Sequence, residues 1–423
     1  MALTGKILAY LATDYAFIFL ALLFRASWLT VFVLPMAVLI FASFKLPKLQ
    51  PLPIDVARRI RPKRSMGDED VEVTLTVTNI SPHPIEALQF DDNLPYGVKL
   101  KSGTNRLMLS LGPGEVAELK YTLSSPKRGR HELGPTLFVF KDNLRLRSIS
   151  GQLSNVDELL VLPKIENLGT VDLRGRRVGP WPGLVPSRRM GIGTEFFELA
   201  PYIPGDDLRR VNWKASARSR QLVTNEFEGE QVVDVLVVLD CSEGVLSDIF
   251  DYDLLEFQVR FAASLCSQLI MQGNRVGLSI YGAVRTWLDL AFGKRQLLRI
   301  LDSLAIVRPG AATLPIRYVV ESVVSAILPA RSLVLLISPM IGDDVPEMIE
   351  NIATKGYSTI CFTPSIGTAP SDLSDSSRIA RRIFAAERRL RINNVKHLTR
   401  VIEISPTRAI KPSIRMRNEW KAA

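Results

Sequence analysis

The residues whose types and spacing point most clearly to chemistry follow an apolar run at residues 232–239. Asp240 comes directly after that run, and Ser242 lies two residues later, within the sequence DCSEG. Carboxylate and hydroxyl oxygens suit a hard divalent cation such as Mg²⁺. If the run is a central strand of an open sheet, these residues lie at its carboxyl end, where such sheets place ligands. Asp240 and Ser242 are therefore candidate magnesium ligands.

This segment resembles the D-x-S-x-S metal motif of von Willebrand factor A domains. Asp240 and Ser242 match the motif, and Thr313 stands where that fold commonly supplies a threonine ligand. Gly244 replaces the second serine, and Pro339 stands where a later aspartate often occurs. Because Mg²⁺ needs a nearly complete octahedral oxygen shell, the absence of this hydroxyl and this carboxylate weakens the expected binding. The alternative is that Asp240 and Ser242 cap the following loop and helix by bonding backbone amides.

Other catalytic groups are scarce in the sequence. His397 is the only histidine beyond residue 131, and it has no G-x-S-x-G partner for a Ser/His/Asp arrangement. The sequence also has no G-x-x-x-x-G-K-[ST] loop for nucleotide phosphates. We therefore expect a protein that is not an enzyme. The rival class is a metal-dependent hydrolase at Asp240, which would still need a general base.

A second distinctive stretch, residues 191–218, combines glycine, acidic, aromatic and basic residues. Trp213 and Tyr202 could anchor a partner, because aromatic side chains supply a large contact area. Asp206 could instead form internal contacts, with Gly205 permitting the turn. We expect Asp206 and Trp213 to lock the stretch internally and the arginines to be more open to a partner. The basic cluster comprises Arg209, Arg210, Lys214, Arg218 and Arg220.

This stretch resembles the hallmark segment of the family called domain of unknown function 58. The resemblance implies a link with MoxR-type AAA+ ATPases, and hence an adaptor or scaffold that helps to assemble or remodel membrane or cell-envelope complexes. Arg209, Trp213 and Arg218 would then form the docking surface for a partner. Ala200 and Pro201 depart from the family pattern, which often has Arg and an acidic residue there. The matching residues are Gly193, Glu195, Phe196, Tyr202, Gly205, Asp206, Arg209, Trp213, Ala217 and Arg218.

The elements around this signature predict two different folds. Residues 71–79 alternate apolar and polar side chains, and turn signals separate further short strand-like runs, which favours an immunoglobulin-like antiparallel β-sandwich over residues 51–165. The signature segment occupies residues 166–230. Apolar strand-like and helix-like runs then alternate, which favours a doubly wound, von Willebrand factor A-like α/β domain over residues 231–423.

The N-terminal residues contain two apolar runs, at 7–24 and 28–44. Their lengths predict a transmembrane helical hairpin within residues 1–50, with a secretory signal peptide as the alternative. Basic residues follow the second run, so both ends of the hairpin should face the cytoplasm. These features predict a multi-pass protein of the cell membrane, with two helices and with most of the chain cytoplasmic.

The formal net charge of +10 favours partners that carry negative charge. Residues 376–391 predict an arginine-rich helix that could bind an acidic lipid, RNA or a protein. Because the helix lacks the interleaved aromatic residues of a single-strand binder, we expect an anionic lipid surface or an acidic protein and no nucleic acid. Three widely spaced cysteines, Cys241, Cys266 and Cys361, predict buried thiols rather than a zinc or redox site.

Overall fold

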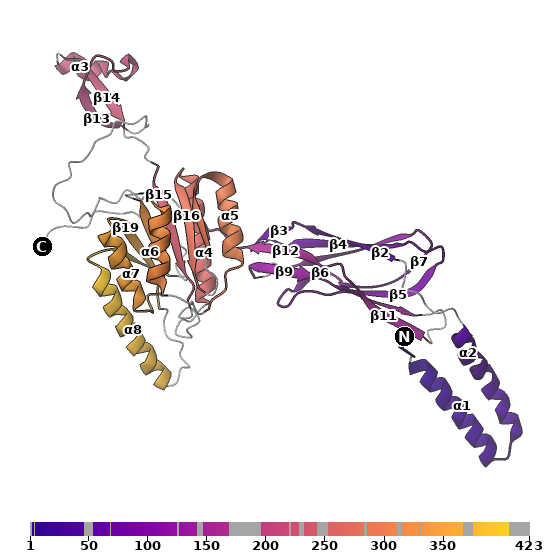
Figure 1. Ribbon diagram of the computed structural model, residues 1–423. Coiled ribbons are helices and arrows are strands. Elements are labelled where there is room, and N and C mark those ends of the chain that lie inside the picture. Colours follow the sequence, from indigo (N-terminus) through magenta and orange to yellow (C-terminus); the bar gives the residue numbers. More distant parts are fainter. Residues whose placement is uncertain are drawn as a thin grey trace. The chain divides into compact units, whose positions relative to one another are not determined.

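The computed structural model contains two compact units, Met1–Lys164 with Leu301–Ile306, and Ile165–Ile300 with Val307–Ala423 (Figure 1). The structure describes residues 2–3, 5–45, 54–67, 69–124, 127–141, 147–168, 196–219, 221–227, 232–242, 253–282, 286–310, 315–329, 332–366 and 375–405.

The first unit begins with a short strand, β1 (Ala2–Leu3), and two neighbouring helices, α1 (Gly5–Leu23) and α2 (Val33–Lys45), joined through the 3-10 helix η1 (Ser27–Phe32) (Figure 1). None of the helices in the described ranges is long and apolar enough to cross a membrane. The second predicted membrane helix, at residues 28–44, is shorter than expected because its first residues form η1. The 13 residues of α2 span about 20 Å, whereas a hydrocarbon core is about 30 Å thick. The predicted transmembrane hairpin is therefore wrong, and so is the multi-pass membrane location inferred from it.

The rest of this unit is rich in antiparallel sheet. Strand orders are β1-β11-β10-β5-β7, β2-β4-β8-β6 and β3-β12-β9. In β4, which confirms the strand predicted over residues 71–79, every second residue is buried. The apolar ones, Val71, Val73, Leu75 and Val77, join one core with residues of β5 and β8. The strands are β2 (Ile54–Arg61), β3 (Arg64–Met66), β4 (Val71–Asn79), β5 (Ile85–Asp92), β6 (Leu100–Gly103), β7 (Arg106–Leu111), β8 (Val116–Leu123), β9 (Gly129–Leu133), β10 (Thr136–Lys141), β11 (Arg147–Leu153) and β12 (Asp157–Leu162).

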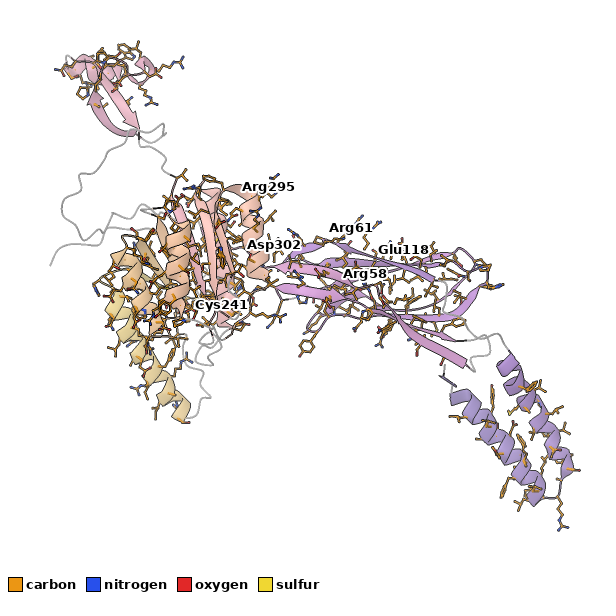
Figure 2. All side chains as sticks on the ribbon, viewed as in Figure 1. Arg58, Arg61, Glu118, Cys241, Arg295 and Asp302 are labelled. Atoms are coloured by element: carbon orange, nitrogen blue, oxygen red, sulfur yellow. The ribbon has the colours of Figure 1, made fainter. Side chains whose placement is uncertain are left out.

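A buried arginine connects several of these strands (Figure 2). The side chain of Arg58 in β2 is fully buried, and its guanidinium forms an ion pair with Asp92 of β5. Arg58 Nη2 also donates to Thr136 Oγ1 in β10 at 3.0 Å. The hydroxyl of Tyr121 in β8 donates to Asp92 Oδ2 at 2.6 Å, and burial raises the pKa of Tyr121. The buried charges are thus paired and hydrogen-bonded among the strands of this unit.

The second unit contains a six-stranded sheet in the order β17-β16-β15-β18-β19-β20. All neighbours pair in parallel except β17, which is antiparallel to β16. The apolar run at residues 232–239 corresponds to β15, and two of the later strand-like runs correspond to β18 and β19. The elements are β15 (Asp234–Asp240), α4 (Leu254–Met271), β16 (Arg275–Tyr281), β17 (Thr286–Ala291), α5 (Gly293–Ala305), α6 (Ile316–Ile327), β18 (Leu333–Ile337), α7 (Asp344–Thr354), β19 (Ser358–Pro364), α8 (Asp375–Val395) and β20 (Arg400–Ile404).

Helices cover both faces of this sheet. Residues of α6 and α7 share a core with β15, β18 and Cys361 of β19. The neighbouring residue Phe362 points to the opposite face, because side chains alternate along a strand, and its ring lies 5.1 Å from that of Phe261 in α4. The predicted buried thiols are also confirmed, since all three cysteines are buried and none forms a disulfide. Burial raises the pKa of Cys266 to about 12.

Candidate functional site

Most of the predicted signature residues lie in a small hydrogen-bonded motif, which we call the signature module (residues 196–227). It contains β13 (Phe196–Pro201), η2 (Leu208–Arg210), α3 (Trp213–Ser219) and β14 (Val223–Phe227) (Figure 1). β13 and β14 pair in antiparallel fashion. Beyond that ladder, the Tyr202 amide donates to the Leu222 carbonyl at 2.8 Å and the Asn212 amide to the Val223 carbonyl at 2.8 Å. The chain therefore folds back on itself and brings η2 and α3 against β14.

Acidic residues stabilise the turn between β13 and η2. Gly205 adopts a φ of +118°, which a side chain would strongly disfavour. Asp206 Oδ2 accepts a hydrogen bond from the Ile203 amide at 2.9 Å, and Asp207 Oδ1 accepts one from the Arg209 amide at 3.0 Å. Asp206 and Asp207 thus hold the backbone that presents Arg209.

Two residues that the sequence analysis did not single out hold α3 in place. Asn212 Oδ1 accepts a hydrogen bond from the Ala215 amide at 3.0 Å, and its Nδ2 donates to Asn225 Oδ1 at 2.9 Å. The buried hydroxyl of Ser216 accepts a hydrogen bond from the Val223 amide at 2.9 Å. An asparagine just before a short helix is a known N-terminal capping signal, so Asn212 could have been found from the sequence.

The predicted partner-binding residues are on the surface of this module. Trp213, the first residue of α3, is 67% exposed, which does not fit the internal lock expected for it. Arg209 in η2 and Arg218 in α3 are exposed as well. Tyr202 is half-buried. Gly193 and Glu195 lie outside the described residues, and for Phe196 only the backbone is described.

The candidate metal residues occupy a different environment, at the carboxyl edge of the six-stranded sheet. Asp240 is the last residue of β15 and is only 3% exposed. Its Oδ2 accepts a hydrogen bond from Ser338 Oγ at 2.7 Å, and its Oδ1 accepts one from the Ser242 amide at 3.1 Å. Burial raises the pKa of Asp240, and the hydrogen bonds from Ser338 and Ser242 partly offset that rise. Cys241, labelled in Figure 2, directly follows Asp240.

A buried arginine also supports this edge of the sheet. The sequence analysis did not identify it as a structural residue. Arg388 in α8 is only 4% exposed. Its Nε donates to the Pro339 carbonyl at 2.8 Å, and its Nη2 donates to Thr363 Oγ1 at 2.6 Å and to the Pro364 carbonyl. Asp240 and Arg388 thus contact the consecutive residues Ser338 and Pro339. The guanidinium places a fixed positive charge at this edge.

These contacts bear on the predicted magnesium site. Both carboxylate oxygens of Asp240 accept hydrogen bonds, and the one from the Ser242 amide is the capping contact that the alternative interpretation requires. Thr313 lies outside the described residues. The described residues alone do not make the nearly complete oxygen shell that Mg²⁺ needs, and within them no group of three or more His, Cys, Asp or Glu side chains could hold a metal ion. Asp240, Ser242 and Thr313 as metal ligands stay a prediction.

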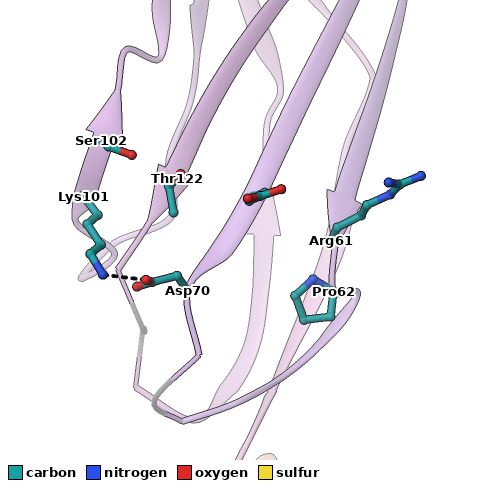
Figure 3. A pocket seen from close by; sticks show the side chains of 7 residues that line it. Arg61, Pro62, Asp70, Lys101, Ser102 and Thr122 are labelled. Atoms are coloured by element: carbon teal, nitrogen blue, oxygen red, sulfur yellow. Dashed lines mark hydrogen bonds and ion pairs between the residues drawn. The ribbon is translucent and has the colours of Figure 1, made fainter.

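The first unit carries a surface hollow of about 690 Å³ (Figure 3). Lys101 Nζ and Asp70 Oδ2 form an ion pair across part of it at 2.5 Å. Its lining side chains carry charges of both signs. It is lined by Arg61, Pro62, Asp70, Glu72, Lys101, Ser102 and Thr122.

Comparison with solved structures gives weak matches. Conserved hypothetical protein BatB from Bacteroides thetaiotaomicron is 16% identical, with a TM-score of 0.26, and the match covers 40% of this chain and 90% of that chain. The CARDB domain of PF1109 from Pyrococcus furiosus is 14% identical, with a TM-score of 0.19, and the match covers 26% of this chain and 94% of that domain. Similarity at this level carries no argument about fold or function.

Sequence comparison is more informative. The uncharacterized protein YeaD of Bacillus subtilis (strain 168) is 25% identical over 254 residues, which make up 59% of this chain and 61% of that protein. The match thus spans less than two thirds of its relative. The family model described as "Protein of unknown function DUF58" matches residues 198–361, which include most of the signature module, Asp240 and Ser338. Residues 198–361 thus match the DUF58 family, and the similarity to YeaD supports a DUF58 family protein.

Proposed function

We propose that this protein is an adaptor or scaffold that binds another protein through the exposed side chains of the signature module. The observation that carries this proposal is the 67% exposure of Trp213 on a module whose fold is held by other residues. Tryptophan and arginine are the side chains most enriched at the energetic centres of protein interfaces. Arg209 and Arg218 are exposed on the same module.

The internal contacts of the module support a division of roles. Asp206, Asp207, Asn212 and Ser216 make the hydrogen bonds that fold it. Trp213 keeps most of its surface in water, so a partner that covers the ring removes apolar area from solvent. The exposed arginines of the same module favour a partner surface that carries carboxylates.

For the partner we propose a MoxR-type AAA+ ATPase, which is what the family resemblance suggests. The chain would then act as an adaptor that presents client proteins to the ATPase or is remodelled by it during assembly of a larger complex. Acidic side chains on the ATPase would face Arg209 and Arg218.

The test is crosslinked affinity capture of the full-length protein from cells, followed by mass spectrometry. We compare wild type with Arg209→Glu, and we use Arg295→Glu, which alters an exposed arginine of α5, as the matched control. Wild type and the control should retain an AAA+ ATPase, and Arg209→Glu should lose it while its thermal melt stays unchanged. Capture without an AAA+ ATPase in the wild type, or equal retention by Arg209→Glu, would contradict the proposal.

A further inference from the structure

Helix α8 presents aliphatic side chains to solvent at a spacing typical of helix pairing. Ile379, Ile383 and Leu390 are 58%, 55% and 64% exposed. Ala386, also exposed, completes a series of four residues separated by steps of four, three and four. This is the alternation of a and d positions in a heptad repeat. We call these four residues the α8 stripe.

The opposite side of α8 is packed against the rest of the α/β unit. Arg388 and Val395, seven residues apart, are buried. With 3.6 residues per turn, Arg388 lies about 180° around the helix from Ile379. The hydrogen bonds of Arg388 to Pro339, Thr363 and Pro364 fix this orientation, and Arg391 Nε adds an ion pair with Asp343 Oδ1 at 2.6 Å. The stripe therefore points away from the core of its unit.

One flank of the stripe is basic. Arg382 and Arg389 are exposed, and each immediately precedes a stripe residue, which is the g position of a heptad. On the other flank, Glu387 lies at an e position, with its Oε2 3.9 Å from Arg391 Nη2. Charges at e and g positions select the partner helix and its orientation in coiled coils.

We propose that α8 pairs with an amphipathic helix of a partner protein, whose acidic side chains face Arg382 and Arg389. The stripe buries its aliphatic side chains against apolar residues of that helix, and the arginines bind its carboxylates. The stripe covers an arc of only about 60°, from the 100° turn per residue. That is the narrow seam of a helix pair rather than the broad apolar face with which a helix lies on a lipid surface. This surface is separate from the signature module and goes beyond the proposed function.

The test uses the full-length protein and a fluorescently labelled 21-residue peptide of three heptads. The peptide carries Leu or Ile at a and d positions and Glu at e and g positions, where like charges oppose its self-association. Binding is followed by fluorescence anisotropy. A peptide of identical composition with the apolar residues redistributed around the helix is the control probe.

We expect the heptad peptide to bind and the redistributed peptide to bind at least about tenfold more weakly. The double variant Ile383→Ser, Leu390→Ser should weaken binding by about tenfold or more, because both side chains lose apolar contact. Arg382→Gln with Arg389→Gln should weaken binding and flatten its dependence on salt concentration. Arg295→Gln with Arg299→Gln removes the same charge from α5 and should leave binding unchanged.

Equal binding of both peptides, or full binding by the Ile383→Ser, Leu390→Ser variant, would overturn the proposal. The proposal would also be overturned if the protein does not bind the peptide but binds phosphatidylglycerol vesicles through the stripe. Trp213→Ala should bind the peptide like wild type. Loss of peptide binding by this variant would contradict α8 as the binding surface. The proposed partner of the signature module can thus fail without affecting this result.

Discussion

The signature module and the carboxyl edge of the six-stranded sheet both contain residues that the sequence marks as candidates, but the two regions expose them very differently. Trp213 is 67% exposed, whereas Asp240 is 3% exposed. In the module, the side chains of Asp206, Asn212 and Ser216 accept the hydrogen bonds that hold the fold. At the sheet edge, Asp240 itself makes the hydrogen bonds, with Ser242 and Ser338.

This difference separates residues that can contact a partner from residues that support the fold. Substitutions at the sheet edge should change stability, because they disturb buried polar groups. Substitutions of the exposed module residues should change binding and leave stability nearly unchanged. The comparison would fail if substituting an exposed module residue lowered stability, or if substituting a sheet-edge residue left stability unchanged.

The largest expected effect on stability is at Arg388. Arg388→Ala leaves the buried oxygens of Pro339, Thr363 and Pro364 without their donor. We expect the free energy of unfolding to fall by about 3 kcal/mol, measured by denaturant unfolding. Arg389→Ala, a substitution of the exposed neighbouring residue, should change it by less than about 0.5 kcal/mol. Equal effects of the two substitutions would show that the buried contacts of Arg388 add little.

A smaller, pH-dependent effect is expected at Asp240. Since burial raises the pKa of Asp240 in the folded state, the folded protein binds more protons than the unfolded chain, and the contribution of Asp240 to stability falls as pH rises above its unfolded pKa of about 3.9. At pH 3, Asp240→Asn should lower the free energy of unfolding by about 1 kcal/mol, because one hydrogen bond is lost. That deficit should shrink toward pH 7.

Melting curves of wild type, Asp240→Asn and Glu350→Gln at pH 3, 5 and 7 measure this trend. Glu350→Gln makes the same chemical change at an exposed site and should show no such trend. A deficit of Asp240→Asn that grows with pH would contradict the account. Millimolar Mg²⁺ should leave the wild-type melt unshifted if Asp240 acts as a cap, and a shift that Asp240→Asn abolishes would establish the metal site instead.

Local sequence patterns predicted much of the fold. The alternation at residues 71–79 gives β4, and the apolar runs give the central strands β15, β18 and β19. These predictions succeed because burial on one or both faces of a sheet leaves a period in the sequence. The hairpin prediction failed because hydropathy does not show where a helix begins, and residues 27–32 form η1 instead of extending α2.

Long-range contacts were harder to predict. The hydrogen bond from Ser338 to Asp240 joins residues 98 positions apart, and Arg388 reaches residues 24 to 49 positions away. No local period marks such partners, because they follow from the order of the strands in the sheet. The sequence showed an arginine-rich helix at residues 376–391, but only the packing of α8 separates buried Arg388 from exposed Arg389.

The most direct test of the central claim is a paired measurement on Trp213→Ala in the full-length protein. Denaturant unfolding gives its stability, and crosslinked capture gives its retention of the AAA+ ATPase. The account predicts a change of less than about 0.5 kcal/mol in the free energy of unfolding and a loss of most ATPase retention, since a central tryptophan contributes strongly to an interface. Wild-type retention of the ATPase by a stably folded Trp213→Ala variant would contradict the claim that the signature module is the partner-binding surface.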